Sequence, residues 1–91
     1  MKKTLFPLGS IVATPGALDL LEQLGENPMT YLSRHARGDW GDLCDDDKAE
    51  NDFSVPRCLR ILSAYKTPKG KLWVITEADR SATTLLLPDE Y

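Results

Sequence analysis

The chain has 91 residues, 42% of them hydrophobic and 27% charged, which is typical of one small soluble domain rather than a disordered chain. Its formal net charge of −3 gives no global basic field that would favour nucleic acid or an anionic membrane. No stretch approaches the roughly 18 consecutive apolar residues of a membrane span, and Pro7, Gly9 and Ser10 interrupt the first apolar stretch before a secretion signal can form. We therefore expect a single domain over residues 1–91, located in the cytoplasm and away from membranes.

The two cysteines, Cys44 and Cys58, agree with a cytoplasmic location. They lack the C-x-x-C spacing, and a secreted chain of this size usually carries more bridges to compensate for its limited core. We interpret them as reduced thiols, with Cys58 half-buried on a strand and Cys44 near an acidic segment.

The N-terminal part of the chain is predicted to form a strand and two helices. A short β-branched run predicts a strand over 9–13, either at a sheet edge or docked across a helix. Thr14-Pro15 is typical of a helix start, and leucines at three-residue spacing predict a helix over 15–24. Asn27-Pro28 repeats the same start, and the second helix is expected to end at Gly38.

An acidic segment follows over residues 39–52. It holds seven acids and one base, a local charge of −6, whereas the rest of the chain carries +3. Trp40 and Leu43 are its only large apolar residues, so it is expected to form at most a surface helix over about 42–51. Its acids are Asp39, Asp42, Asp45, Asp46, Asp47, Glu50 and Asp52.

The C-terminal part changes to a period of two, which indicates strands. We expect strands over 57–65, 71–77 and 82–87, joined by turns over 66–70 and 78–81. Leu59, Ile61, Ser63 and Tyr65 share one face of the first of these strands. Short connections favour an antiparallel meander, with helices covering one face. The predicted fold class is α+β: an N-terminal strand and two to three short helices packed on a three- to four-stranded antiparallel sheet.

The acidic segment has two interpretations. It is either a solvated helix face or a recognition surface that attracts a basic macromolecular partner, above all a protein. Trp40 is either a buried anchor for the segment or an exposed interface residue. Asp45-Asp46-Asp47 lacks the alternating spacing and the glycine of a calcium loop, so we expect no metal and no cofactor. The candidate binding residues are Trp40, Asp42, Asp45, Asp46, Asp47 and Glu50.

His35 is the only histidine and lies in the last turn of the second predicted helix. There it can act structurally, as a C-terminal cap or a half-buried ring, because a cation interacts favourably with the helix dipole. It can also act as a general base, since an imidazole titrates near neutrality. The order of elements broadly resembles small RNA-cleaving toxins of the barnase/RelE-like class. That alternative makes His35 the base or acid, with Arg60 or Arg80 on a phosphate.

A structural interpretation covers the polar residues of the C-terminal strands. Thr76, Thr83 and Thr84 would supply β-propensity and hydrogen bonds on the solvent face. Asp79-Arg80-Ser81 would form the turn between two strands. An acidic chain is also a poor start for binding RNA, because phosphate contacts dominate affinity. We therefore favour this interpretation over a ribonuclease.

Several strings of the chain resemble a family of small uncharacterised bacterial proteins, often labelled plasmid-related, that occur on plasmids and integrated elements. The most specific are Gly38-Asp39-Trp40-Gly41-Asp42 and Thr76-Glu77-Ala78-Asp79-Arg80-Ser81. The resemblance covers nearly the whole chain. It implies a mobile-element setting and brings with it no activity, catalytic residues or cofactor.

Three hypotheses about function follow. The leading one is an accessory or interaction protein that binds a macromolecule, such as a host-defence or plasmid-maintenance component. The second is the ribonuclease, and the third is an acidic mimic of nucleic acid. The sequence does not exclude nucleic acid as a partner, because the chain outside the acidic segment is slightly basic. The sequence does not indicate an oligomeric state, although an open sheet edge would offer a route to pairing.

Overall fold

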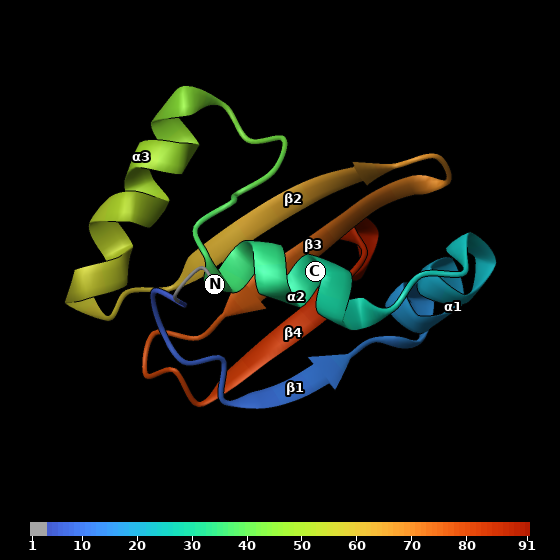
Figure 1. Cartoon of the computed structure of the whole chain (residues 1–91), viewed down its shortest axis with the longest axis horizontal. Helices are drawn as coiled ribbons and strands as arrows, with labels where there is room; N and C mark the ends of the chain where they lie inside the picture. The colour runs from blue at the N-terminus through green and yellow to red at the C-terminus, as the bar shows by residue number, and fades with distance from the viewer. Residues whose placement is uncertain (1–3) are drawn as a thin grey trace.

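Residues 4–91 are described by a computed structural model, and the chain over this range has an α+β fold, as predicted (Figure 1). In chain order the elements are β1 (Ser10–Ala13), α1 (Pro15–Leu24), α2 (Pro28–Ala36), α3 (Asp45–Ser54), the 3-10 turn η1 (Val55–Arg57), β2 (Ile61–Thr67), β3 (Gly70–Thr76), β4 (Ala82–Leu86) and the 3-10 turn η2 (Pro88–Glu90). Among these residues no helix is long and apolar enough to cross a membrane.

The sheet has the strand order β1-β4-β3-β2. The predicted antiparallel meander of β2, β3 and β4 is confirmed, whereas β1 runs parallel to β4. The expectation of a wholly antiparallel sheet was therefore wrong. Most of the chain lies between β1 and β4, so no tight hairpin forces these two strands to be antiparallel. Of its two predicted positions, β1 takes the one at an edge of the sheet.

The two predicted helix starts are confirmed in atomic detail. The Thr14 hydroxyl oxygen accepts a hydrogen bond from the Ala17 N–H at 3.2 Å, and Asn27 Oδ1 accepts one from the Met29 N–H at 2.8 Å. Each cap is followed by proline at the first helical position, where the missing N–H costs no intrahelical bond. Gly25, at φ 66°, ends α1 in the left-handed conformation expected of a C-terminal glycine.

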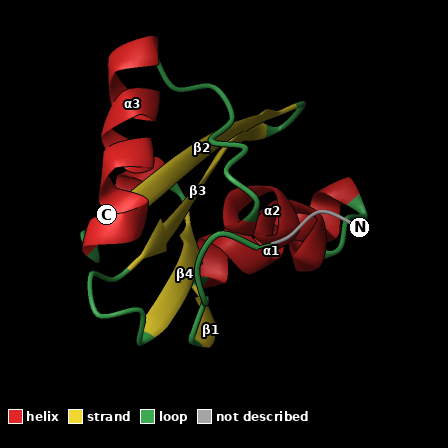
Figure 2. Ribbon diagram, turned by 60° about the vertical axis from the view of Figure 1, so that its left-hand side comes forward, coloured by secondary structure: helices red, strands yellow, loops and turns green. Residues whose placement is uncertain are grey.

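Helices α1 and α2 lie together against one face of the sheet (Figure 2). The side chains of Leu20, Leu21 and Leu32 from these two helices form the main core with those of Tyr65, Leu72, Val74 and Leu85 from the sheet. The third helix, α3, lies alongside β2 at the outer edge of the sheet, and the C terminus lies on the side of the sheet away from α1 and α2 (Figure 2). The prediction that helices cover one face therefore holds for α1 and α2 only.

The segment between α3 and β2 differs from its prediction. The acidic helix extends to Ser54, and β2 starts at Ile61 instead of Arg57. Pro56 lies in η1, and Cys58 adopts the left-handed conformation at φ 51°, which breaks the period-two pattern before a strand can begin. Cys58 is thus exposed in a turn and not half-buried on a strand, and Cys44 is exposed and free as well. Leu59 is 44% exposed and does not join the predicted buried face.

Candidate functional site

His35 lies in the centre of the molecule. Its residue is 0% exposed, and its Nδ1 and Nε2 atoms lie 2.6 Å from Ser63 Oγ and 2.9 Å from Thr76 Oγ1. The rings of Phe6 and Trp40 meet it edge-on, with centroids at 5.3 Å and 5.9 Å. The predicted position in the last turn of α2 is confirmed, but the ring turns into the core, so neither the half-buried ring nor the C-terminal cap describes it.

The hydrogen bonds around His35 fix its tautomer. Thr83 donates its hydroxyl proton to the Leu8 carbonyl at 2.7 Å, so its oxygen accepts from Thr76, 2.7 Å away. The Thr76 hydroxyl is then a donor to Thr83 and must accept from His35 Nε2–H. His35 Nδ1 is left as the acceptor for the Ser63 hydroxyl. Ser63, His35, Thr76 and Thr83 thus form one buried chain of hydrogen bonds, which we call the histidine network.

Burial keeps the imidazole of His35 neutral at physiological pH. Burial, with a smaller contribution from the positive charge of Arg80, lowers the pKa of His35 from 6.5 to about 4. Both ring nitrogens are engaged and the residue has no exposed surface. The ring bonds α2 to β2 and β3 directly and to β4 through Thr76 and Thr83, and it has no path to a substrate in solution.

The expectation that the threonines lie on the solvent face is wrong for two of the three. Thr76 and Thr83 are 0% exposed and face α2, not solvent. The sequence contained a signal for this arrangement, because Ser63 and Thr76 alternate with apolar residues on the inward positions of their strands. A lone histidine above three inward hydroxyls on neighbouring strands indicates a polar core network more readily than a catalytic site.

The two arginines assigned to the ribonuclease hypothesis have structural contacts. Arg80 lies in the predicted turn, and its guanidinium donates to the carbonyls of Leu59 at 2.7 Å and Ser54 at 3.1 Å. It thereby ties the end of α3 to the β3–β4 turn. Arg60 donates to the Tyr91 hydroxyl and lies over the Tyr91 ring, 5.2 Å from its centroid. The structure does not bring His35, Arg60 and Arg80 together at an open surface.

Trp40 is a buried anchor and not an exposed interface residue. It is 4% exposed, stacks on Phe6 with ring centroids 6.2 Å apart, and donates its indole N–H to Asp52 Oδ1 at 2.9 Å. This hydrogen bond ties α3 to the small second core around Phe6 and Ile61. Of the six predicted binding residues, Trp40 therefore lies inside the molecule and holds the acidic helix in place.

The five acids of the predicted binding surface are all exposed: Asp42, Asp45, Asp46, Asp47 and Glu50. Asp42 precedes α3, and its carboxylate accepts the Lys66 N–H at 2.7 Å. The other four lie on α3. Within residues 4–91 the only ion pair joins Arg34 and Asp39, at 2.7 Å. These four acids, which we call the acidic face, thus carry their charges without a cationic partner from the described chain. The fifth acid of α3, Asp52, accepts the Trp40 indole N–H.

The outer edge of β2 is closed by the acidic segment. The Asn51 side chain donates to the Leu62 carbonyl at 2.7 Å and accepts the Leu62 N–H at 3.2 Å, in the manner of a neighbouring strand. The Asp42 N–H donates to the Ala64 carbonyl at 2.6 Å, and the Ala64 N–H donates to the Trp40 carbonyl at 3.2 Å. These bonds hold α3 against β2 and protect that edge from pairing with another strand. Sequence reasoning did not identify Asn51.

A groove of about 310 Å³ lies between α3 and β2. Its lining comes from the acidic segment and from the start of β2: Leu43, Asp47, Glu50, Asn51, Arg60 and Leu62. Two predicted binding residues, Asp47 and Glu50, therefore belong to a shaped depression, whereas Asp45 and Asp46 lie outside it.

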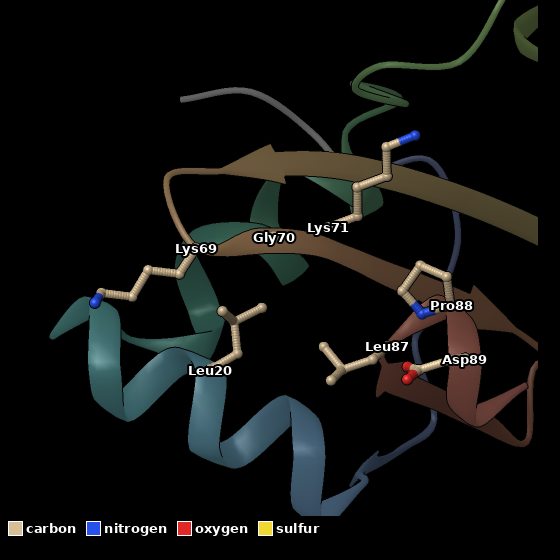
Figure 3. A pocket seen from close by; sticks show the side chains of 7 residues that line it. All are labelled: Leu20, Lys69, Gly70, Lys71, Leu87, Pro88 and Asp89. Atoms are coloured by element: carbon tan, nitrogen blue, oxygen red, sulfur yellow. The ribbon is translucent and has the colours of Figure 1, made fainter.

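A second groove, of about 390 Å³, lies between α1, the β2–β3 turn and η2 (Figure 3). Leu20 and Leu87 face each other across it, while the ammonium ends of Lys69 and Lys71 point away from that space and in different directions. Ligand sites combine an apolar lining with a few convergent polar groups. This groove has the apolar lining but no convergent polar groups, so we do not assign it a function.

Among residues 4–91 no group of three or more histidine, cysteine, aspartate or glutamate side chains is arranged to hold a metal ion. Comparison with protein-family models, with curated proteins and with solved structures finds no match to this chain. The acidic face with its adjoining groove is the surface that brings predicted binding residues together.

Proposed function

We propose that this protein is a small accessory protein that acts by binding a basic protein partner through the acidic face. The observation that carries the proposal is the arrangement of α3. Asp45, Asp46, Asp47 and Glu50 are exposed on one short helix, and they form no ion pair within the described residues. An unneutralised patch of one sign attracts a partner of the opposite sign and raises its association rate.

The way α3 is held supports this proposal. An isolated acidic helix of ten residues is marginal in water. Here Trp40 binds Asp52, Asn51 binds the β2 backbone, and Arg80 binds the carbonyls at the end of the helix. The chain thus presents a rigid acidic helix, and such rigidity lowers the entropy lost on binding.

The cellular setting is part of the same proposal. We infer a bacterial mobile element and a cytoplasmic location, with a host-defence or plasmid-maintenance component as the partner. The mobile-element setting rests on the sequence resemblance, and the location rests on the cysteine usage. The carboxylates are gathered on one helix instead of being spread over a face, which favours this proposal over a mimic of nucleic acid. No contact of His35, Arg60 or Arg80 favours the ribonuclease.

Charge reversal on α3 tests the proposal. We expect the triple variant Asp45→Lys/Asp46→Lys/Asp47→Lys to lose the proteins that wild type recovers from a bacterial extract, because the patch then repels a basic surface. The matched control reverses three exposed acids outside the segment, Asp19→Lys/Glu22→Lys/Glu77→Lys, and so makes the same change in net charge. Recovery is measured by quantitative pull-down at low and at moderate salt, with circular dichroism to verify that both variants fold.

The control separates the site from the net charge. If the acidic face is the binding surface, the control variant keeps the partners that the α3 variant loses, and higher salt weakens recovery by wild type. Equal recovery of every protein by wild type and the α3 variant would show that the acidic face is not the binding surface.

A further inference from the structure

The groove beside α3 combines two kinds of surface. Leu43 and Leu62 are partly buried and supply its apolar lining. Asp47 and Glu50 also line it, and their positions three residues apart put both acidic side chains on the same side of α3. A side chain that fits here needs an aliphatic stem and a cationic end.

The one cationic side chain that lines the groove is engaged elsewhere. Arg60 donates to the Tyr91 hydroxyl and packs its guanidinium over the Tyr91 ring. It forms no ion pair with Asp47 or Glu50, and no other described residue does so either. The two carboxylates therefore remain available to a cation from outside the chain.

Hydrogen bonds within the chain hold both walls of the groove in position before any ligand binds. Asn51 is buried, with 6% of the residue exposed, and its two side-chain hydrogen bonds to the Leu62 backbone join α3 to β2 at the groove itself. A ligand would therefore find both walls already positioned, and little ordering entropy would be lost on binding.

We propose that this groove binds an arginine side chain of the protein partner, an inference that rests on the proposed function. The arginine methylenes pack on Leu43 and Leu62, and the guanidinium meets Asp47 and Glu50. Arginine fits better than lysine for two reasons. Its planar group offers several N–H donors to two carboxylates at once, and it is more weakly hydrated than an ammonium, so it enters a partly apolar groove at lower cost.

Two capped peptides test the choice of side chain: Gly-Ser-Arg-Ser-Gly and the same peptide with lysine in place of arginine. Each is titrated into the whole 15N-labelled protein, and amide chemical shifts are followed. We expect the arginine peptide to shift the amide signals of Leu43 and Leu62 and to bind about tenfold more tightly than the lysine peptide, as for one additional charge-assisted hydrogen bond.

A pair of matched double variants tests the position. Asp47→Asn/Glu50→Gln removes the groove carboxylates and is expected to weaken the arginine peptide about tenfold or more. Asp45→Asn/Asp46→Asn removes the same charge from the same helix outside the groove and is expected to change the affinity less than about twofold. Thermal unfolding of both variants is measured alongside.

The outcomes separate this inference from the proposed function. Equal affinity of wild type for the two peptides would show that the groove does not select arginine. Equal weakening of binding by the two double variants would show that the groove carboxylates have no special role. Either result would overturn the proposed arginine site, and the acidic face would then act only as a general acidic surface. If the groove variant does not fold, the comparison of the two peptides on wild type decides alone. Failure of the proposed function would appear instead as unchanged recovery of partners by the charge-reversed α3 variant.

Discussion

Replacing His35 with leucine is expected to lower the free energy of unfolding by about 2–4 kcal/mol, a large share of the stability of a small domain. The reason is the histidine network. Leucine fills much of the imidazole volume, but it leaves the Ser63 hydroxyl without its acceptor and the Thr76 oxygen without its donor, in a site closed to water. The loss is measured by urea denaturation, followed by circular dichroism and tryptophan fluorescence.

A triple variant is the control for this prediction. In His35→Leu/Ser63→Ala/Thr76→Val both hydroxyl partners are removed with the ring, so few unsatisfied polar groups remain and much of the lost stability is expected to return. The Thr83 hydroxyl keeps its bond to the Leu8 carbonyl in this variant. A His35→Leu variant as stable as wild type would contradict a structural role for His35 and would favour its assignment to catalysis instead.

Mild acid is expected to destabilise the protein through the same residue. The pKa of His35 is about 4 in the folded chain against 6.5 for an unperturbed histidine side chain, chiefly because of burial. Between these values the unfolded chain binds more protons than the folded one, so the free energy of unfolding falls as the pH falls. The contribution is fully present above pH 6.5 and decreases by about 3 kcal/mol on acidification to pH 4.

The pH dependence of the triple variant isolates this contribution. The pKa of Asp39 is lowered, chiefly by its hydrogen bond from Arg34, and that of Glu90 is lowered, chiefly by the Thr14 hydroxyl. Both carboxylates lose their contributions at lower pH than the histidine, and both are intact in the triple variant. Subtracting its unfolding curve from that of wild type should leave a loss confined to pH 4–6.5. Parallel curves over that range would show that His35 does not carry the effect.

The sequence predicts the local features of this fold better than the long-range ones. The start of α1 follows from Thr14 and Pro15, and the end follows from Gly25, because capping and backbone conformation are properties of a few adjacent residues. The β2–β3 hairpin follows from period-two patterns joined by a short turn. The direction of β1 depends on a partner some seventy residues away, so no local pattern could determine it.

In the candidate site, too, the sequence predicts the local features better than those that depend on distant residues. The acidic face is visible in the composition of residues 39–52, because exposed charges are what a surface helix requires. The roles of Trp40 and Asn51 are not visible, since each depends on which distant residue it meets: Asp52 for the indole and the Leu62 backbone for the amide. The burial of His35 depends on three strands that bring hydroxyl groups under α2.

Photo-crosslinking in bacterial cells tests whether α3 contacts the partner. A photoreactive amino acid is placed at Ala49, which is exposed on α3, or at Gln23, which is exposed on α1. We expect a discrete protein adduct from position 49 and none from position 23, and the adduct from position 49 should disappear when Asp45, Asp46 and Asp47 are changed to lysine. An adduct from position 23 alone, or one from position 49 that survives the charge reversal, would show that the acidic face does not bind the partner.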